Sequence, residues 1–217
     1  MGLVGRVGSA CGPSESERAG RSGGARYGRV TDHMRIIAGS LKGRRLEAPT
    51  WEGLRPTSDK LRETLFNILA ARIVGARVLD GYAGTGAIGI EALSRGAQHA
   101  TFIEHDRRAQ ALIERNLAHC GIADGYAIIR QTVALGLERL RGQPAFDIIL
   151  LDPPYTNGTI AEADGPLAAA AGVMAAGGVL ILEHARKRRA PETAGQLVRS
   201  REVSSGDSVL SFYEVRS

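Results

Sequence analysis

Residues 78–86 read Val78-Leu79-Asp80-Gly81-Tyr82-Ala83-Gly84-Thr85-Gly86, a pattern that predicts a buried strand, a glycine-rich turn and the start of a helix. Gly84 and Gly86 lack a Cβ, so a ligand can approach the backbone closely, and the amino end of the helix offers free N–H groups. Asp80 stands at the strand end, where a carboxylate can meet a cationic ligand. Such a turn can serve a phosphate, a dinucleotide or only strand–helix packing. No Lys-Ser/Thr pair follows the glycines, which argues against a nucleotide triphosphate loop.

A second strand is predicted at residues 100–104, and it ends in Glu104, 18 residues after Gly86. In doubly wound folds an acid about 20 residues beyond the glycines holds a ribose diol. The alternative is a carboxylate that is merely solvated at the end of its strand. With the glycine turn in place, ligand binding is the favoured interpretation of Glu104.

The third motif is Asp152-Pro153-Pro154-Tyr155, which follows the hydrophobic run 146–151. Consecutive prolines cannot donate ladder hydrogen bonds, so the predicted strand must stop there. The turn presents the Asp152 carboxylate, the Pro153 carbonyl and an aromatic ring, which together suit a flat group that carries an NH2. The alternative is an Asp-Pro turn with a packed tyrosine.

From residue 76 onward, predicted strands and helices alternate, which indicates a doubly wound α/β fold with helices on both faces of a mostly parallel, seven-stranded sheet. The expected parallel strands are 77–80, 100–104, 126–130, 146–151 and 178–183, and the expected helices are 86–95, 106–120, 133–141 and 159–175. Residues 197–203 and 208–215 are expected to form an antiparallel hairpin at one edge. Ligands in open sheets bind at the carboxyl ends of strands, where Asp80, Glu104 and Asp152 all lie.

The order of these motifs resembles the class I S-adenosylmethionine-dependent methyltransferases, and the last motif resembles those that methylate exocyclic amino groups of nucleic-acid bases. Residues 34–46 and 55–69 resemble the amino-terminal segment of the bacterial 16S ribosomal RNA guanine-N2 methyltransferases. The resemblance extends from Met34 to the carboxyl terminus. It implies a Rossmann-like fold, S-adenosylmethionine as cofactor and methylation of a guanine N2 in 16S rRNA, whether free or within a partly assembled small ribosomal subunit.

The resemblance also implies roles for individual residues. The cofactor-binding residues would be Asp80, Gly81, Ala83, Gly84, Gly86 and Glu104. The catalytic residues would be Asp152, Pro153 and Tyr155, with Tyr155 stacking on the target base. The chain departs from the family pattern at Gln131-Thr132, where an acid that can approach the adenine is common, and at 204–207, where an aromatic-glycine pair is common. No metal is required.

Lysine and arginine give the 217-residue chain a net charge of +5, unevenly placed. One cluster comprises Arg35, Lys42, Arg44, Arg45, Arg55, Lys60 and Arg62, and another comprises residues 186–189. Such clusters can neutralise phosphates, although charge runs more often form a solvated face. We expect Arg55 and Arg62, in the block most specific to the family, to contact RNA.

Three segments are predicted along the chain. Residues 1–33 are rich in Gly, Ser, Arg and Ala and lack aliphatic periodicity, which predicts a disordered tail. Residues 34–72 form an extension, with a hairpin of strands 35–38 and 44–48 and a helix capped by Thr57 or Ser58. Residues 73–217 form the methyltransferase domain.

Cysteine content and hydropathy indicate the cellular compartment in which the protein is expected. Two cysteines in unlike contexts, Cys11 and Cys120, suggest no disulfide framework. No run approaches the roughly 18 apolar residues of a membrane span, and no signal region opens the chain. These features predict a cytoplasmic protein, and we also expect it to be a monomer.

Three rival functions remain open. A DNA adenine-N6 methyltransferase uses the same Asp-Pro-Pro-Tyr motif, and a protein glutamine methyltransferase more commonly has Asn at the position of Asp152. A non-catalytic RNA-binding module could retain the fold without the activity. The intact glycine turn, Glu104 and Asp152 argue against such decay.

Overall fold

The chain divides into two units, Met1–Asp32 and His33–Ser217. The computed structural model describes residues 34–51, 57–153 and 161–216, all within the second unit. The predicted disordered tail, Arg55 and Tyr155 lie outside the described residues. None of the helices in these ranges has both the length and the apolar character needed to span a bilayer.

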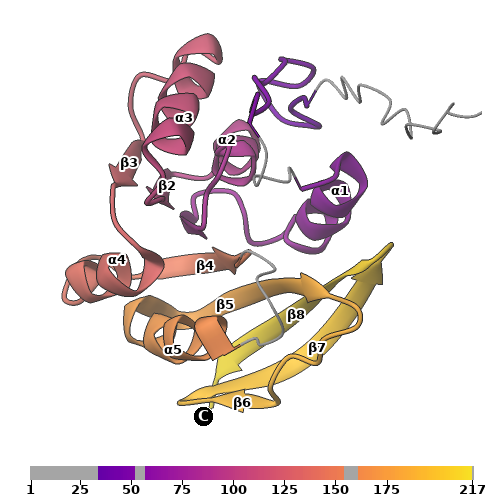
Figure 1. The fold of residues 1–217 in the computed structure, drawn as a ribbon, viewed down its shortest axis with the longest axis vertical. Helices are drawn as coiled ribbons and strands as arrows, with labels where there is room; N and C mark the ends of the chain where they lie inside the picture. Colours follow the sequence, from indigo (N-terminus) through magenta and orange to yellow (C-terminus); the bar gives the residue numbers. More distant parts are fainter. Residues whose placement is uncertain (1–33, 52–56, 154–160, 217) are drawn as a thin grey trace, which may run out of the picture. The chain divides into compact units, whose positions relative to one another are not determined.

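An eight-stranded sheet organises the second unit, with strand order β3-β2-β1-β4-β5-β8-β7-β6 (Figure 1). The strands are β1 (Arg77–Gly81), β2 (His99–Ile103), β3 (Tyr126–Ile129), β4 (Phe146–Leu151), β5 (Met174–Ala185), β6 (Thr193–Ala194), β7 (Leu197–Ser205) and β8 (Ser208–Val215). β1 to β5 pair in parallel, and β6, β7 and β8 add antiparallel pairs. The predicted doubly wound α/β fold is confirmed.

The sheet has eight strands where the sequence predicted seven. The additional strand, β6, pairs only Thr193 with Val198 and Ala194 with Leu197. A two-residue strand is too short to show any periodicity in the sequence. β5 also begins at Met174 and passes through Gly177 and Gly178, whereas the prediction began at residue 178. Glycine is disfavoured within strands, so the sequence did not predict the first residues of β5.

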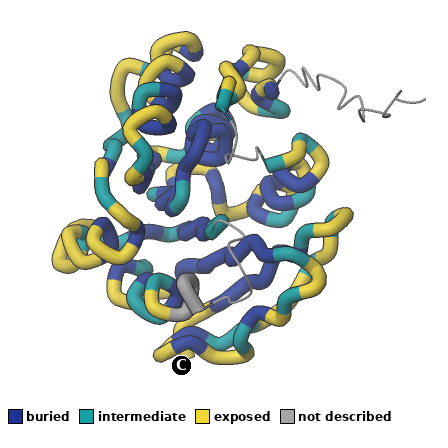
Figure 2. Tube along the Cα trace, viewed as in Figure 1, coloured by how far each residue is buried: buried dark blue, intermediate teal, exposed yellow. Residues whose placement is uncertain are grey.

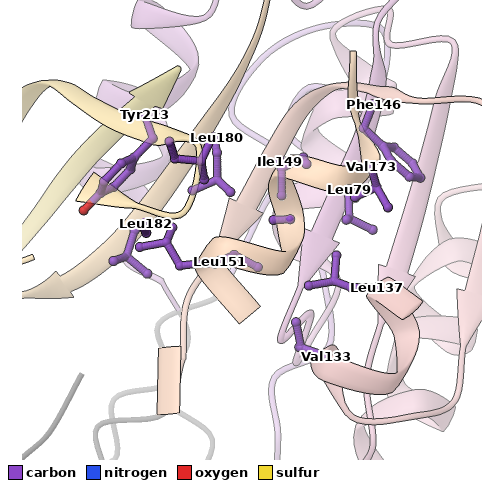
Figure 3. Packing of buried hydrophobic residues seen from close by; sticks show 14 of the residues in the cluster. Leu79, Val133, Leu137, Phe146, Ile149, Leu151, Val173, Leu180, Leu182 and Tyr213 are labelled. Atoms are coloured by element: carbon purple, nitrogen blue, oxygen red, sulfur yellow. The ribbon is translucent and has the colours of Figure 1, made fainter. Parts of the chain in front are cut away.

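Two layers of helices enclose the sheet. The helices are α1 (Asp59–Ile68), α2 (Ala87–Ser94), α3 (Arg107–His119), α4 (Val133–Leu140) and α5 (Ala161–Ala170), followed by the 3-10 turn η1 (Ala171–Val173). Side chains of α4 pack with Leu79, Ile149 and Leu180 on one face (Figure 3). Side chains of α5 belong to the same cluster. Side chains of α1 and α2 pack with Val78, Ile148 and Ile181 on the other. The central strands are therefore buried from both sides (Figure 2).

The amino-terminal extension is less regular than predicted. A single antiparallel bridge between Arg35 and Arg45 replaces the expected pair of strands, and α1 ends at Ile68 instead of near residue 72. Ser58 caps α1 as expected, its hydroxyl accepting from the Leu61 N–H at 3.2 Å. The extension is attached to α2: a Cβ at Gly39 would lie 1.9 Å from the Ser94 carbonyl oxygen, so only glycine permits this contact.

Candidate active site

The three predicted acids lie at the carboxyl ends of adjacent strands. β1 pairs with both β2 and β4, and Gly81 is in register with Ile103 on one side and Leu151 on the other. Glu104 and Asp152 each follow directly after those partners, so the acids flank the end of β1. A Cβ on Gly81 would lie 2.6 Å from Leu151 Cδ2 and 3.2 Å from the Leu150 carbonyl oxygen, so a larger residue would force its neighbours to shift.

The glycine turn departs from ordinary backbone geometry at three positions. Tyr82, Gly84 and Gly86 have φ angles of 62°, 56° and 75°. A positive φ at a residue other than glycine is uncommon, and such strain clusters at functional sites. At Gly86, which caps α2, an added Cβ would lie 3.2 Å from Ile113 Cγ1, so this position is constrained by packing as well as by φ. Tyr82 is a feature that the sequence analysis did not single out.

Glu104 organises this turn from the neighbouring strand. Its Oε2 accepts from the Gly84 N–H at 2.9 Å, and its Oε1 accepts from the His105 and Asp106 N–H groups at 2.7 and 2.8 Å. The residue is only 6% exposed, which excludes the alternative of a solvated carboxylate. A negative charge is thus fixed beside Gly84 before any ligand binds.

Asp80 is a second buried carboxylate, 4% exposed. Its Oδ2 accepts from the Gly89 N–H of α2 at 3.0 Å, and no cationic side chain of the described residues pairs with it. Burial raises the pKa of Asp80 to about 7, the Gly89 hydrogen bond opposes that rise, and the charge of Glu104 adds to it. A cationic ligand would restore the ionised form. Gly89 is essential here because a Cβ would lie 2.2 Å from Phe102 Cε1.

Asp152 leaves β4 beside the glycine turn, with its N–H 3.5 Å from the Gly81 carbonyl oxygen. Asp152 and Pro153 are half-buried. One crevice is lined by Asp152, Asp80 and Glu183, the last at the carboxyl side of β5. Glu183 accepts from the Ser208 hydroxyl at 3.0 Å. The sequence predicts Glu183 at the end of a strand and indicates no role for it. Tyr155 is beyond the last described residue of this turn.

Gln131 and Thr132, the two residues after β3 at which the chain departs from the family pattern, have different environments. Thr132 is the N-cap of α4, its hydroxyl accepting from the Leu135 N–H at 3.5 Å. The Gln131 Oε1 atom is buried and has no hydrogen-bond donor among the described residues. It is therefore an unused acceptor at the carboxyl end of β3, next to the strand that carries Glu104.

The prediction that Arg62 contacts RNA is wrong. Its side chain is 0% exposed, and Nη2 donates to the Arg35 carbonyl oxygen at 2.8 Å and to Asp59 Oδ1 at 2.6 Å. Nη1 also lies 3.7 Å from Glu91 Oε2. Arg62 is therefore a structural cation inside the extension. The amphipathic pattern of α1 suggested an exposed position, because a buried arginine needs partners distant in sequence to be recognised.

Glu91 and Asn116 were missed altogether, and both are 0% exposed. Glu91 accepts from the Ile37 and Ala38 N–H groups at 2.7 and 3.0 Å. Asn116 accepts from the Glu47 N–H at 2.7 Å and donates to the Thr85 carbonyl oxygen at 3.0 Å. Asn116 thus joins the extension to the glycine turn. The available signal was a polar residue on the apolar face of a predicted helix.

No metal-binding cluster of His, Cys, Asp and Glu occurs in the portion of the chain that the structure describes. The buried thiol of Cys120 is free, and burial raises its pKa.

This sheet order, with a glycine turn after β1 and an acid after β2, defines a class I methyltransferase fold. A family model described as "Conserved hypothetical protein 95" matches residues 34–214, and the chain belongs to that family. The family resemblance predicted from the sequence is confirmed.

Two relatives show what the family contains. The chain is 45% identical over 129 residues to "Ribosomal RNA small subunit methyltransferase D" of Escherichia coli, a match that covers 59% of this chain and 64% of that protein. It is 35% identical over 184 residues to "Putative rRNA methyltransferase YlbH" of Bacillus subtilis, covering 84% and 100% of the two chains.

Solved structures agree with the fold. The structure of "Putative methyltransferase yhhF" from Escherichia coli is 33% identical, with a TM-score of 0.70, and the match covers 84% of this chain and 98% of that one. A structure from Thermus thermophilus is 30% identical, with a TM-score of 0.72 and coverage of 84% and 99%.

Proposed function

We propose that this protein transfers a methyl group from S-adenosylmethionine to the exocyclic N2 amino group of a guanine in 16S ribosomal RNA. The observation that carries the proposal is the adjacency of β1 and β4, which brings the glycine turn and Asp152 out of the sheet side by side. The names of the relatives support ribosomal RNA as the substrate class. The Asp-Pro-Pro-Tyr motif supports an amino group as the methyl acceptor.

The described residues fit the cofactor. S-adenosylmethionine supplies an activated methyl group on a sulfonium centre. Asp80 is a buried carboxylate without a cationic partner among the described residues, and it would face the positive charge of this ligand. Glu104 would accept from the ribose hydroxyls while it continues to hold Gly84. Gln131 Oε1 would accept from the adenine amino group.

The protein's task at the amine is orientation and charge stabilisation. A guanine N2 lone pair is delocalised into the ring and is a poor nucleophile. The Asp152 carboxylate and the Pro153 carbonyl would each accept a hydrogen bond from one N–H of the amino group. The hydrogen bond to Asp152 would strengthen as positive charge develops on nitrogen. Immediately after transfer the methylated nitrogen is positively charged and strongly acidic, so it can release its proton to water and a strong general base is not required. Tyr155 would hold the unstacked base.

Product identity tests the proposal. The purified protein is incubated with methyl-labelled S-adenosylmethionine and either 16S RNA, assembled small subunits or duplex DNA, and the modified nucleoside is identified by mass spectrometry. The proposal expects N2-methylguanosine from an RNA substrate. N6-methyl-2′-deoxyadenosine from DNA would establish the rival methyltransferase, and RNA binding without any affinity for the cofactor would favour a binding module.

A further inference from the structure

A second basic region surrounds a cavity of about 490 Å³. Its cations are Arg186, Arg188 and Arg189 from the connection between β5 and β6, and Arg199 from β7; Glu192 and Glu202 also line it. Four guanidinium groups against two carboxylates leave an excess of positive charge. The volume falls within the roughly 300–1,000 Å³ typical of ligand sites.

Part of this cavity is rigidly built. Arg199 is 20% exposed at its side chain, and its Nη1 donates to the Ala190 carbonyl oxygen at 2.7 Å and to Glu202 Oε1 at 2.8 Å. The Ser211 hydroxyl, itself 2.8 Å from His184 Nε2, donates to the same Glu202 oxygen at 3.0 Å. The negative charge of Glu202 is therefore already compensated within the protein.

Two of the arginines that line the cavity are not committed in this way. Arg186 and Arg189 are exposed, and no side chain or carbonyl group among the described residues engages their guanidinium groups. Guanidinium groups with free donors match the geometry of a phosphate, to which they can donate two hydrogen bonds at once. An exposed pair beside a prearranged polar wall is a suitable anion site.

The cavity is close to the catalytic edge of the sheet. Leu182 of β5 is in register with Leu151 of β4, so Glu183 lies level with Asp152. Arg186 comes three residues later, or about 10 Å further along the direction of the strand at the usual rise per residue. A polynucleotide whose base reaches Asp152 would pass within this range.

We propose that Arg186 and Arg189 bind a backbone phosphate of the RNA strand that flanks the target nucleotide. The identity of that RNA rests on the function proposed above, but phosphate recognition by the cavity does not require methyl transfer to occur. Arg186 and Arg189 lie in the connection between β5 and β6 and are separate in sequence from the amino-terminal cluster of basic residues. It deepens the proposed function by assigning a surface that holds the substrate.

A charge-matched pair of double variants tests this site. Arg186→Gln with Arg189→Gln removes the proposed phosphate contacts. Arg139→Gln with Arg141→Gln removes the same charge from the end of α4, where the chain approaches the amino end of β4. RNA dissociation constants are measured for both, and for the wild type, across a series of salt concentrations. Melting temperature and cofactor affinity verify that each variant is folded.

The Arg186/Arg189 variant should bind RNA about tenfold more weakly at 0.1 M salt, and each lost contact should flatten the slope of log K against log salt by about 0.7, the value for single strands. The Arg139/Arg141 variant should retain the wild-type slope. Equal slopes for all three proteins would overturn the site. If the slope depends on Arg186 and Arg189 but the wild type methylates no RNA, the phosphate site stands and the proposed function fails.

Discussion

Replacing Glu104 with alanine should damage the glycine turn and the cofactor site together. The side chain accepts from three backbone N–H groups, and the one on Gly84 is fully buried. The hydrogen bonds from the His105 and Asp106 N–H groups are only part-buried, so we expect water to replace the carboxylate there. The main loss is thus one buried hydrogen bond to a charged group. We expect the free energy of unfolding to fall by about 2–3 kcal/mol.

The same substitution should weaken cofactor binding by about 10- to 100-fold, because a ribose diol would lose a charged acceptor worth about 1.5–3 kcal/mol. Calorimetry with S-adenosylhomocysteine and its 2′-deoxy analogue separates the two roles. Wild-type protein should prefer the intact diol, and Glu104→Gln, which keeps the size of the side chain, should lose that preference. Glu114→Ala, an exposed glutamate on α3, is the matched control. Equal wild-type affinity for both ligands would refute the assignment of Glu104 to the ribose.

The remaining predictions concern three buried polar residues. The pKa of Asp80 is raised to about 7, so between about pH 4 and 7 the folded protein retains a proton that the unfolded chain releases. The free energy of unfolding should therefore fall as pH rises from about 4 to 7. S-adenosylmethionine affinity, measured by calorimetry, should rise between about pH 6 and 8. Asp80→Asn should abolish that rise, and a flat wild-type profile would contradict it. Asn116→Ala should cost about 2–4 kcal/mol in denaturant unfolding by leaving buried backbone groups unpaired, whereas an unchanged midpoint would show that water replaces the amide. Arg62→Met should lower the free energy of unfolding by about 3–5 kcal/mol, because it leaves Glu91 with one cation fewer. The RNA affinity of the folded variant should be unchanged, and a selective loss of that affinity would show that Arg62 contacts RNA.

Local sequence patterns predicted most of the sheet because each element carried its own signal. Strands β1 to β4 are short and mostly apolar, and glycine follows β1 while two prolines follow β4. The convergence of Asp80, Glu104 and Asp152 followed from one rule about parallel sheets, and the structure places them at adjacent strand ends. Strand β6 was not predicted, because its two residues form a strand only through their pairing with β7.

Contacts between distant segments could not be predicted in the same way. Arg62, Glu91 and Asn116 each look like ordinary polar residues of a helix. Their burial depends on an irregular segment that lies against α2 and α3, with partners 27 to 69 residues away in the chain. The hydrogen bond from the Gly84 N–H to Glu104 could not be predicted either, because it joins the turn after β1 to the end of β2, 20 residues away in the chain.

The most direct test of the central claim is a comparison of methyl transfer by the wild type and by Asp152→Ala on 16S RNA under single-turnover conditions, alongside cofactor binding. Asp152 is half-buried beyond the end of β4, so its removal leaves no cavity in the core. Its proposed partner is the target amine, so cofactor affinity should stay within about threefold, while the rate falls by roughly 100- to 1,000-fold, as when one preorganised transition-state contact is lost. An Asp152→Ala protein that forms N2-methylguanosine at the wild-type rate would contradict the account.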